Sequence, residues 1–163
     1  MTDISYSTGN YIFSYRAAGI LVRDGKVLLQ KPVGADGYAV PGGQVAFGES
    51  HEQTIKREFK EETGADVDVG ELKWVEENIF PFDGKTAQQI CLNYVVTLTD
   101  DKQIPLEGKF PSKEVGEHPL GETIEFHWLP LAEVKNLNVY PENAAELLKR
   151  LDSGVQHLIY RED

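Results

Sequence analysis

The stretch that most limits what this chain can fold into is Gly43 to Ala65, with the sequence GQVAFGESHEQTIKREFKEETGA. Its two ends carry helix signals. Ser50 is a favourable N-cap, and Gln53, three residues later, completes a capping-box pattern. Gly64 suits the left-handed position that follows the last helical turn. Together these signals predict a helix over His51 to Thr63.

Three carboxylates, Glu58, Glu61 and Glu62, stand at i, i+3 and i+4 and converge within one turn of this helix. Like charges at this spacing repel one another, and anions near a helix C-terminus oppose its dipole. At about 100° per residue, the acids flank an apolar stripe of Ile55 and Phe59. A run such as REFKEE also occurs on ordinary solvated helices. The position beside the apolar stripe favours a divalent metal ion that offsets the repulsion.

The loop before the helix is rich in glycine. It contains Pro41-Gly42-Gly43 and ends in Gly48-Glu49. Glycine lets the backbone come close to a ligand, and a carbonyl oxygen in such a loop is a hard donor that suits Mg²⁺. The loop therefore supports a metal site beside the helix.

The segment resembles the signature of the Nudix hydrolases, which is a glycine, five residues, Glu, seven residues and then Arg-Glu-hydrophobic-x-Glu-Glu-x-Gly-hydrophobic. Phe59 is bulkier than the aliphatic residue usual in the family and Ala65 is smaller, and both differences concern packing. The match covers 23 residues (43 to 65) of 163. The matching positions are Gly43, Glu49, Arg57, Glu58, Phe59, Glu61, Glu62, Gly64 and Ala65.

The resemblance implies an α/β fold of the Nudix type, an α/β/α sandwich with a mixed sheet between helices. It also implies hydrolysis of a diphosphate linkage with Mg²⁺, or with Mn²⁺ in its place. The expected substrate is a nucleoside diphosphate derivative: a nucleotide sugar, an ADP-ribose-like compound or a nucleoside triphosphate. The alternative is a non-catalytic nucleotide-binding or regulatory module. Modules of that kind usually lose glutamates of the signature, and this chain keeps them all.

The resemblance further implies which residues form the site. Glu58 and Glu62, one turn apart, are expected to hold the metal ion, with Glu61 as a further ligand. The carbonyl of Gly42 is a plausible backbone ligand. The general base is left open, because in this family it can be a glutamate of the signature or a residue from a distant loop.

Two more parts of the catalytic set are expected outside these ligands. Glu49 and Arg57 should form a charge-assisted bond that holds the loop on the helix. A further carboxylate is expected from the long segment 99–122, which has no clear periodicity. Glu122 is the first choice and Glu117 the second among its acids, and for each of them a solvated loop charge is the competing interpretation.

Substrate-binding residues are expected on other elements. Arg16 and Lys31 lie on strands that lead into the site and could contact a phosphate, although exposed edge charges are the favoured interpretation. Tyr38, Phe47 and Phe80 could stack on a base, and packing in the core or at its rim is the competing interpretation.

The rest of the chain predicts a mixed α/β domain. We expect strands at 14–22, 26–31, 37–40, 66–79, 89–98 and 123–129, with tight turns at Asp24-Gly25 and Asp83-Gly84. Helices are expected at 131–137 and 141–151. No repeat or long linker divides the sequence, so residues 1–163 are expected to form a single Nudix domain.

The formal net charge is −11, from 27 acids and 16 bases. This argues against a protein that coats nucleic acid, because no basic patch would neutralise a polyphosphate backbone. No apolar run reaches the roughly 20 residues that span a bilayer, and the N-terminus lacks a signal-peptide core. The lone Cys91 is expected to be a small buried hydrophobe. These features predict a cytoplasmic protein without membrane contact. A homodimer, common in the family, stays open.

Overall fold

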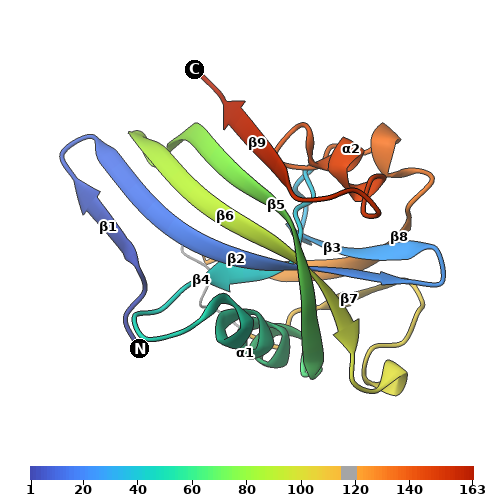
Figure 1. Ribbon diagram of the computed structural model, residues 1–163. Coiled ribbons are helices and arrows are strands. Elements are labelled where there is room, and N and C mark those ends of the chain that lie inside the picture. The colour runs from blue at the N-terminus through green and yellow to red at the C-terminus, as the bar shows by residue number, and fades with distance from the viewer. Residues whose placement is uncertain (115–120) are drawn as a thin grey trace.

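The computed structural model describes residues 1–114 and 121–163. Figure 1 shows a twisted sheet with helix α1 below it and helix α2 above it. The described elements, in chain order, are β1 (Ser5–Thr8), β2 (Tyr11–Arg23), β3 (Lys26–Pro32), β4 (Gly42–Gln44), α1 (His51–Thr63), β5 (Val67–Phe82), β6 (Lys85–Leu98), the 3₁₀-helix η1 (Asp101–Gln103), β7 (Lys109–Pro111), β8 (Ile124–Pro130), the 3₁₀-helix η2 (Val134–Asn136), α2 (Ala144–Leu148) and β9 (Gln156–Arg161).

The nine strands of the described residues form one mixed sheet in the order β7-β8-β3-β2-β6-β5-β9, with β1 and β4 paired to β2. The pairs β2–β6 and β5–β9 are parallel, whereas the hairpin of β5 and β6 is antiparallel. The register sets Arg16 of β2 beside Cys91 of β6, and Cys91 beside Glu76 of β5. Because directly paired residues point to the same face of a sheet, these three side chains share one face.

Helix α1 covers one face of the sheet. Its residues Ile55 and Phe59 are buried, as the apolar stripe predicts, and pack with Val96 of β6 in one hydrophobic cluster. Gly19 of β2 allows this close approach. A Cβ at Gly19 would lie 2.7 Å from Cε2 of Phe59 and 2.9 Å from Cγ1 of Val96, inside van der Waals contact.

Helices η2 and α2 cover the opposite face. Val134 of η2 and Leu148 of α2 are buried in a second cluster with Trp74 of β5 and Ile20 of β2. The sheet is thus enclosed between α1 on one side and η2 and α2 on the other (Figure 1). The expected α/β sandwich with a mixed sheet is confirmed.

Helix α1 begins and ends where the sequence predicts. The side chain of Ser50 accepts a hydrogen bond from the backbone N–H of Gln53 at 3.2 Å, and the side chain of Gln53 accepts one from the backbone N–H of Ser50 at 2.8 Å. Gly64 follows with a φ of 77° and donates its N–H to the carbonyl of Lys60. Both capping interactions join residues that are three or four positions apart, so they can be predicted from the local sequence.

Other predicted boundaries were wrong. Residues 37–40 make only isolated bridges, because Ala39 pairs with Gln30 of β3 while its neighbour Tyr38 pairs with Val139. The segment 131–137 contains only a 3₁₀ turn, and the helix predicted at 141–151 is reduced to α2. The strands β1, β4, β7 and β9 were not predicted. All four are short or largely exposed, so they lack an apolar pattern.

Cys91 is 5% exposed on β6, so its buried position is confirmed. Burial raises the pKa of its thiol above the usual range. Within residues 1–114 and 121–163, we find no helix with the length and apolar character needed to cross a membrane.

Candidate active site

Helix α1 holds its three predicted metal-binding glutamates at different depths. Glu62 is 9% exposed, the side chain of Glu58 is 12% exposed and that of Glu61 is 44% exposed. The order follows from the helical period, because Glu62 lies nearly in line with the buried residue Ile55, two turns earlier. The helix therefore offers one buried carboxylate, one partly buried carboxylate and one at the rim.

Arg57 joins these acids to the loop before the helix. Its Nε and Nη2 donate to the two carboxylate oxygens of Glu49 at 2.8 and 2.9 Å. Its Nη2 also donates to the carbonyl of Gln44 at 3.0 Å. The Nη1 atom donates to Glu58 at 2.6 Å and to Glu61 at 3.3 Å. These contacts agree with the loop-holding role expected for Glu49 and Arg57.

The two glycines of β4 allow close approaches, Gly43 to the carboxylate of Glu58 and Gly42 to the backbone of β2. A Cβ at Gly43 would lie 2.0 Å from Oε1 of Glu58, and a Cβ at Gly42 would lie 2.4 Å from the carbonyl oxygen of Ala17. The carbonyl of Gly42 accepts a hydrogen bond from Nη2 of Arg16 at 2.9 Å. A carbonyl oxygen has two lone pairs, so one remains for a metal ion.

Burial and mutual repulsion oppose the ionisation of these carboxyls. Burial is the larger cause that raises the pKa of Glu62 to about 8, and the charges of Glu58, Glu114 and Glu61 add to it. Burial also raises the pKa of Glu58, although Arg57 acts in the opposite direction. A divalent cation would favour the ionised forms, and carboxylate and carbonyl oxygens are the ligands that Mg²⁺ prefers. The residues present fit a divalent metal ion.

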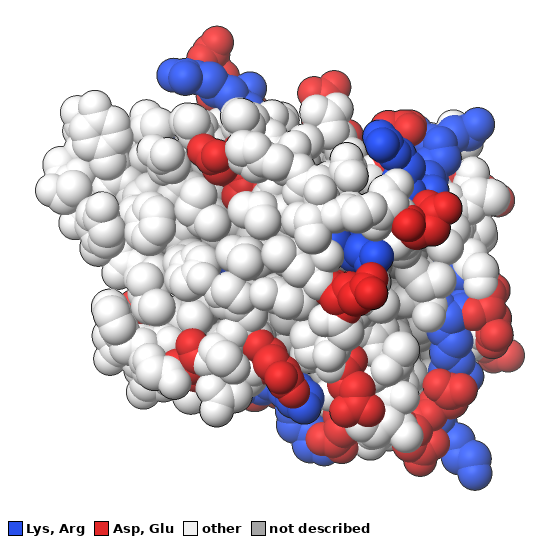
Figure 2. Space-filling view, in the orientation of Figure 1, with Lys and Arg blue, Asp and Glu red and all other residues white. Residues whose placement is uncertain are grey.

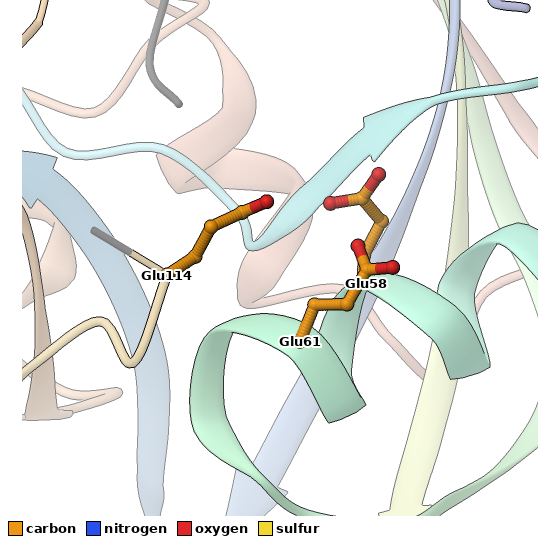
Figure 3. A group of neighbouring side chains, drawn as sticks. All are labelled: Glu58, Glu61 and Glu114. Carbon is orange, nitrogen blue, oxygen red and sulfur yellow. The ribbon is translucent and has the colours of Figure 1, made fainter. Parts of the chain in front are cut away.

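Glu114 joins this site although the sequence did not single it out. Carboxylate oxygens of Glu58, Glu61 and Glu114 lie within 4.8 Å of one another. Figure 3 shows Glu114 reaching from the segment after β7 toward the two glutamates of α1. The backbone N–H of the neighbouring Lys113 donates to the carbonyl of Glu62 at 2.7 Å, which holds the segment against the end of the helix.

Of the two loop acids that the sequence favoured, Glu122 and Glu117, only Glu122 lies in the part of the chain that the structure describes. Glu122 is exposed just before β8 and is not part of the carboxylate group that the described residues form. Glu117 lies outside the described residues. No local pattern points to Glu114, because its position depends on the pairing of β7 with β8 and on the contact between Lys113 and Glu62. A role for Glu122 stays a prediction.

A cavity of about 460 Å³ opens on the sheet face opposite α1. Four of the predicted substrate-binding residues, Arg16, Lys31, Tyr38 and Phe80, line it. Lys31 donates to the carbonyl of Ala35 at 2.9 Å, and its Nζ lies 5.0 Å from the centre of the Tyr38 ring. Phe47 is 70% exposed in the loop before α1 and does not line the cavity.

The floor of this cavity is polar and buried, and the sequence did not predict it. Glu76 and Asn78 of β5 and Asn93 of β6 line the cavity and are 4, 5 and 1% exposed. Glu76 and Asn78 stand two residues apart and therefore point to the same face. The alternation is visible in the sequence, but one strand alone does not reveal which of its faces lines a cavity.

Comparisons with known proteins agree with this geometry. Residues 14–151 match the family model of the NUDIX domain. The solved structure of a NUDIX hydrolase from Nitrosomonas europaea has a TM-score of 0.64 and 21% identity, over 91% of this chain and 79% of that chain. A MutT protein from Bacillus halodurans has a TM-score of 0.60 and 24% identity over 92% of each chain. A UDP-X diphosphatase has a TM-score of 0.59 and 22% identity, over 94% of this chain and 68% of that chain.

Proposed function

The chain belongs to the NUDIX domain family, and we propose that it is a pyrophosphohydrolase that uses Mg²⁺ to cleave the diphosphate linkage of a nucleoside diphosphate derivative. In this proposal the carboxylates of α1 and Glu114 hold the metal ion beside the diphosphate. The organic group attached to the diphosphate occupies the cavity on the opposite face of the sheet.

The observation that carries this proposal is the position of Arg16. Its guanidinium lines the cavity and donates to the carbonyl of Gly42. Its charge lowers the pKa of Glu58 and Glu62 in the carboxylate cluster and also that of Glu76 in the cavity floor, in each case against the larger effect of burial. One cation thus adjoins both regions, so a diphosphate bound beside Arg16 would reach the carboxylates while its organic group stays in the cavity.

The chemistry requires charge neutralisation more than covalent catalysis. A bound divalent ion would offset negative charge on the phosphoryl oxygens and lower the pKa of a water molecule. We assign Glu58 and Glu62 as its principal ligands, with Glu61, Glu114 and the carbonyl of Gly42 as further donors. Arg57 keeps Glu58 in place while it holds Glu49 and the loop. Arg16 orients the diphosphate.

The test is a panel of nucleotide sugars, ADP-ribose-like compounds and nucleoside triphosphates, assayed with Mg²⁺ and with Mn²⁺. We expect Glu62→Gln to lower turnover of the best substrate by the order of 100-fold, which corresponds to about 2.7 kcal/mol in the barrier. The matched control is Glu52→Gln, which removes an exposed carboxylate in the first turn of the same helix. It should retain wild-type turnover.

Metal binding is measured separately by titration calorimetry without substrate. We expect Glu62→Gln to weaken Mg²⁺ and Mn²⁺ binding and Glu52→Gln to leave it unchanged. Equal turnover by wild type and Glu62→Gln would overturn the metal assignment. An absence of turnover across the whole panel would overturn the proposed hydrolysis and favour a nucleotide-binding module.

A further inference from the structure

The floor of the cavity is organised by a chain of hydrogen bonds centred on Glu76. Nε1 of Trp74 donates to Oε1 of Glu76 at 2.7 Å, and Nδ2 of Asn78 donates to Oε2 of Glu76 at 3.0 Å. The same Nδ2 lies 3.5 Å from Oε1 of Gln89, whose Nε2 donates to Ser14 at 3.0 Å. Each carboxylate oxygen of Glu76 therefore has its own donor.

This chain of contacts fixes the orientation of the Asn78 amide. An indole N–H can only donate, so Trp74 requires an acceptor at the first oxygen of Glu76. Ionised Glu76 also accepts at its second oxygen, so Asn78 presents its NH₂ group there. The oxygen of the Asn78 amide is consequently the atom left for another partner.

That oxygen has no partner within residues 1–114 and 121–163. Oδ1 of Asn78 and Oε1 of Gln30 are both buried without a hydrogen bond, and both residues line the cavity. A buried acceptor without a donor is costly, and such atoms in cavities are commonly completed by a ligand. The ligand that completes this floor must donate hydrogen bonds.

The walls of the cavity favour a flat ring. Tyr38, Phe80, Tyr140 and Tyr160 line it from four different segments. Tyr140 packs so closely on the backbone of Gly37 that a Cβ there would lie 2.2 Å from Cε2 of the ring. Aromatic walls can stack on the faces of a planar heterocycle, while the polar floor can form hydrogen bonds with one edge of the same ring.

We propose that the cavity binds a nucleobase with an exocyclic amino group, which donates a hydrogen bond to Oδ1 of Asn78. This inference rests on the proposed function and narrows its substrate class to nucleotides of amino-bearing bases. A base with an oxo group at the same position would bring two acceptor oxygens together. We expect the oxo base to bind more weakly, by about 10- to 100-fold.

The test compares bases in which an oxo group replaces the amino group and the adjacent ring nitrogen changes from an acceptor to an N–H donor: cytidine with uridine, and adenosine with inosine, each as the nucleoside and the monophosphate. Binding is measured by titration calorimetry in the presence of EDTA, so neither metal nor turnover is required. We expect the amino member of each pair to bind more tightly. Equal binding of both members, or no binding of any of them at millimolar concentration, overturns the inference.

Glu76→Gln provides a sharper test, because it should reverse the polarity of the floor. The amide oxygen of the substituted side chain would remain the acceptor for Trp74, which turns the new NH₂ group toward Asn78. The Asn78 amide would then rotate and present its NH₂ group to the cavity. We expect the preference for amino bases over oxo bases to disappear or invert. The control is Glu77→Gln, the adjacent residue on the other face, which contacts His157 at 2.7 Å and should keep the preference.

Asn78→Leu removes the acceptor without relying on a rotation, and it keeps the test decisive if Glu76→Gln fails to fold. It should abolish the preference for the amino base, and an unchanged preference contradicts the inference. Turnover of the panel without any base preference would contradict this inference alone. Selective binding without turnover would contradict only the proposed hydrolysis.

Discussion

At the residue scale, Arg57 shows how one side chain can serve both structure and chemistry. It makes a two-pronged contact with Glu49 across the start of α1 and also contacts Glu58 in the carboxylate cluster. Its carboxylate partners raise the pKa of its guanidinium, so it stays charged under all practical conditions. Arg57 thereby holds Glu58, a proposed metal ligand, and also holds the loop before α1 through Glu49.

The contact between Arg57 and Glu49 predicts a pH-dependent stability. The carboxylate of Glu49 accepts hydrogen bonds from Arg57, and this is the largest cause that lowers its pKa from 4.5 to about 2. The folded state therefore gains its full stabilisation above about pH 4.5 and loses it as the pH falls toward 2. We expect Glu49→Gln to lower the free energy of unfolding by about 1–3 kcal/mol at neutral pH.

Urea unfolding followed by tryptophan fluorescence checks this prediction over the acid range. The difference between wild type and Glu49→Gln should shrink steadily below about pH 4.5. Glu52→Gln, which breaks an exposed pair with Lys56, should change the free energy by less than about 1 kcal/mol. A difference for Glu49→Gln that stays constant down to the lowest pH would show that the ion pair is not its cause.

Gly43 provides a second prediction at this scale. Any Cβ there must displace the carboxylate of Glu58, which lies 2.0 Å from its expected position. We expect Gly43→Ala to weaken Mg²⁺ binding and turnover by about 10- to 100-fold while circular dichroism stays unchanged. Gly154→Ala, where a Cβ meets no atom within 4 Å, is the control. Wild-type metal affinity in Gly43→Ala would remove Glu58 from the ligand set.

At the element scale, helix α1 was predictable because its signals are local. The capping residues, the glycine after the last turn and the apolar stripe all lie within the segment itself. The segment 37–40 and the strands β1, β7 and β9 depend on partners far along the chain. Ala39, for example, pairs with Gln30 while Tyr38 pairs with Val139. A single sequence does not contain that information.

The close packing of α1 on the sheet predicts that one added methyl group at Gly19 lowers stability. Gly19→Ala would bring a carbon to 2.7 Å from Phe59 and 2.9 Å from Val96, so the helix or both side chains must shift. We expect a loss of about 1–3 kcal/mol in the free energy of unfolding, measured by urea denaturation. Gly154→Ala again serves as the control and should stay near wild type. A wild-type free energy of unfolding in Gly19→Ala would mean that α1 packs less closely on the sheet than the contacts indicate.

At the scale of the whole molecule, the signature specified the reaction class but little of the substrate site. Glu58, Glu61 and Glu62 come from one turn, so their convergence follows from the helical period alone. The cavity lining combines Arg16 of β2, Glu76 of β5 and Cys91 of β6, which only the strand register brings together. Glu114 likewise depends on the path of the chain after β7. The register between strands that are far apart in the sequence cannot be predicted from local sequence patterns.

The homodimer and the single domain over residues 1–163 stay predictions. Figure 2 shows that the side where Figure 1 places β1 carries few charged residues, although the net charge is −11. Tyr6 and Tyr11 are 63 and 64% exposed there, on and beside the edge strand β1. Two copies of an acidic chain repel except where uncharged surfaces meet. If the chain forms a dimer, we expect this face to be its interface.

Light scattering after size exclusion tests this expectation. Wild type should show twice the mass of the 18.2 kDa chain, and Tyr11→Glu should shift it toward the monomer. Ile159→Glu, at an exposed position of β9, is the matched control and should keep the wild-type mass. A wild-type monomer contradicts the dimer, and a dimer indifferent to Tyr11→Glu contradicts the choice of face.

The alternation of side chains in the central strands has a consequence for how such a protein can evolve. Arg16 and Ala18 of β2 line the cavity, whereas the alternate residues Ala17 and Gly19 face α1. A substitution at one set of positions alters which molecule is recognised, and a substitution at the other alters how firmly the domain is folded. A change of specificity is therefore least disruptive at cavity residues other than Arg16 and Ala18, because Arg16 donates to the carbonyl of Gly42 and Ala18 packs in the second hydrophobic cluster.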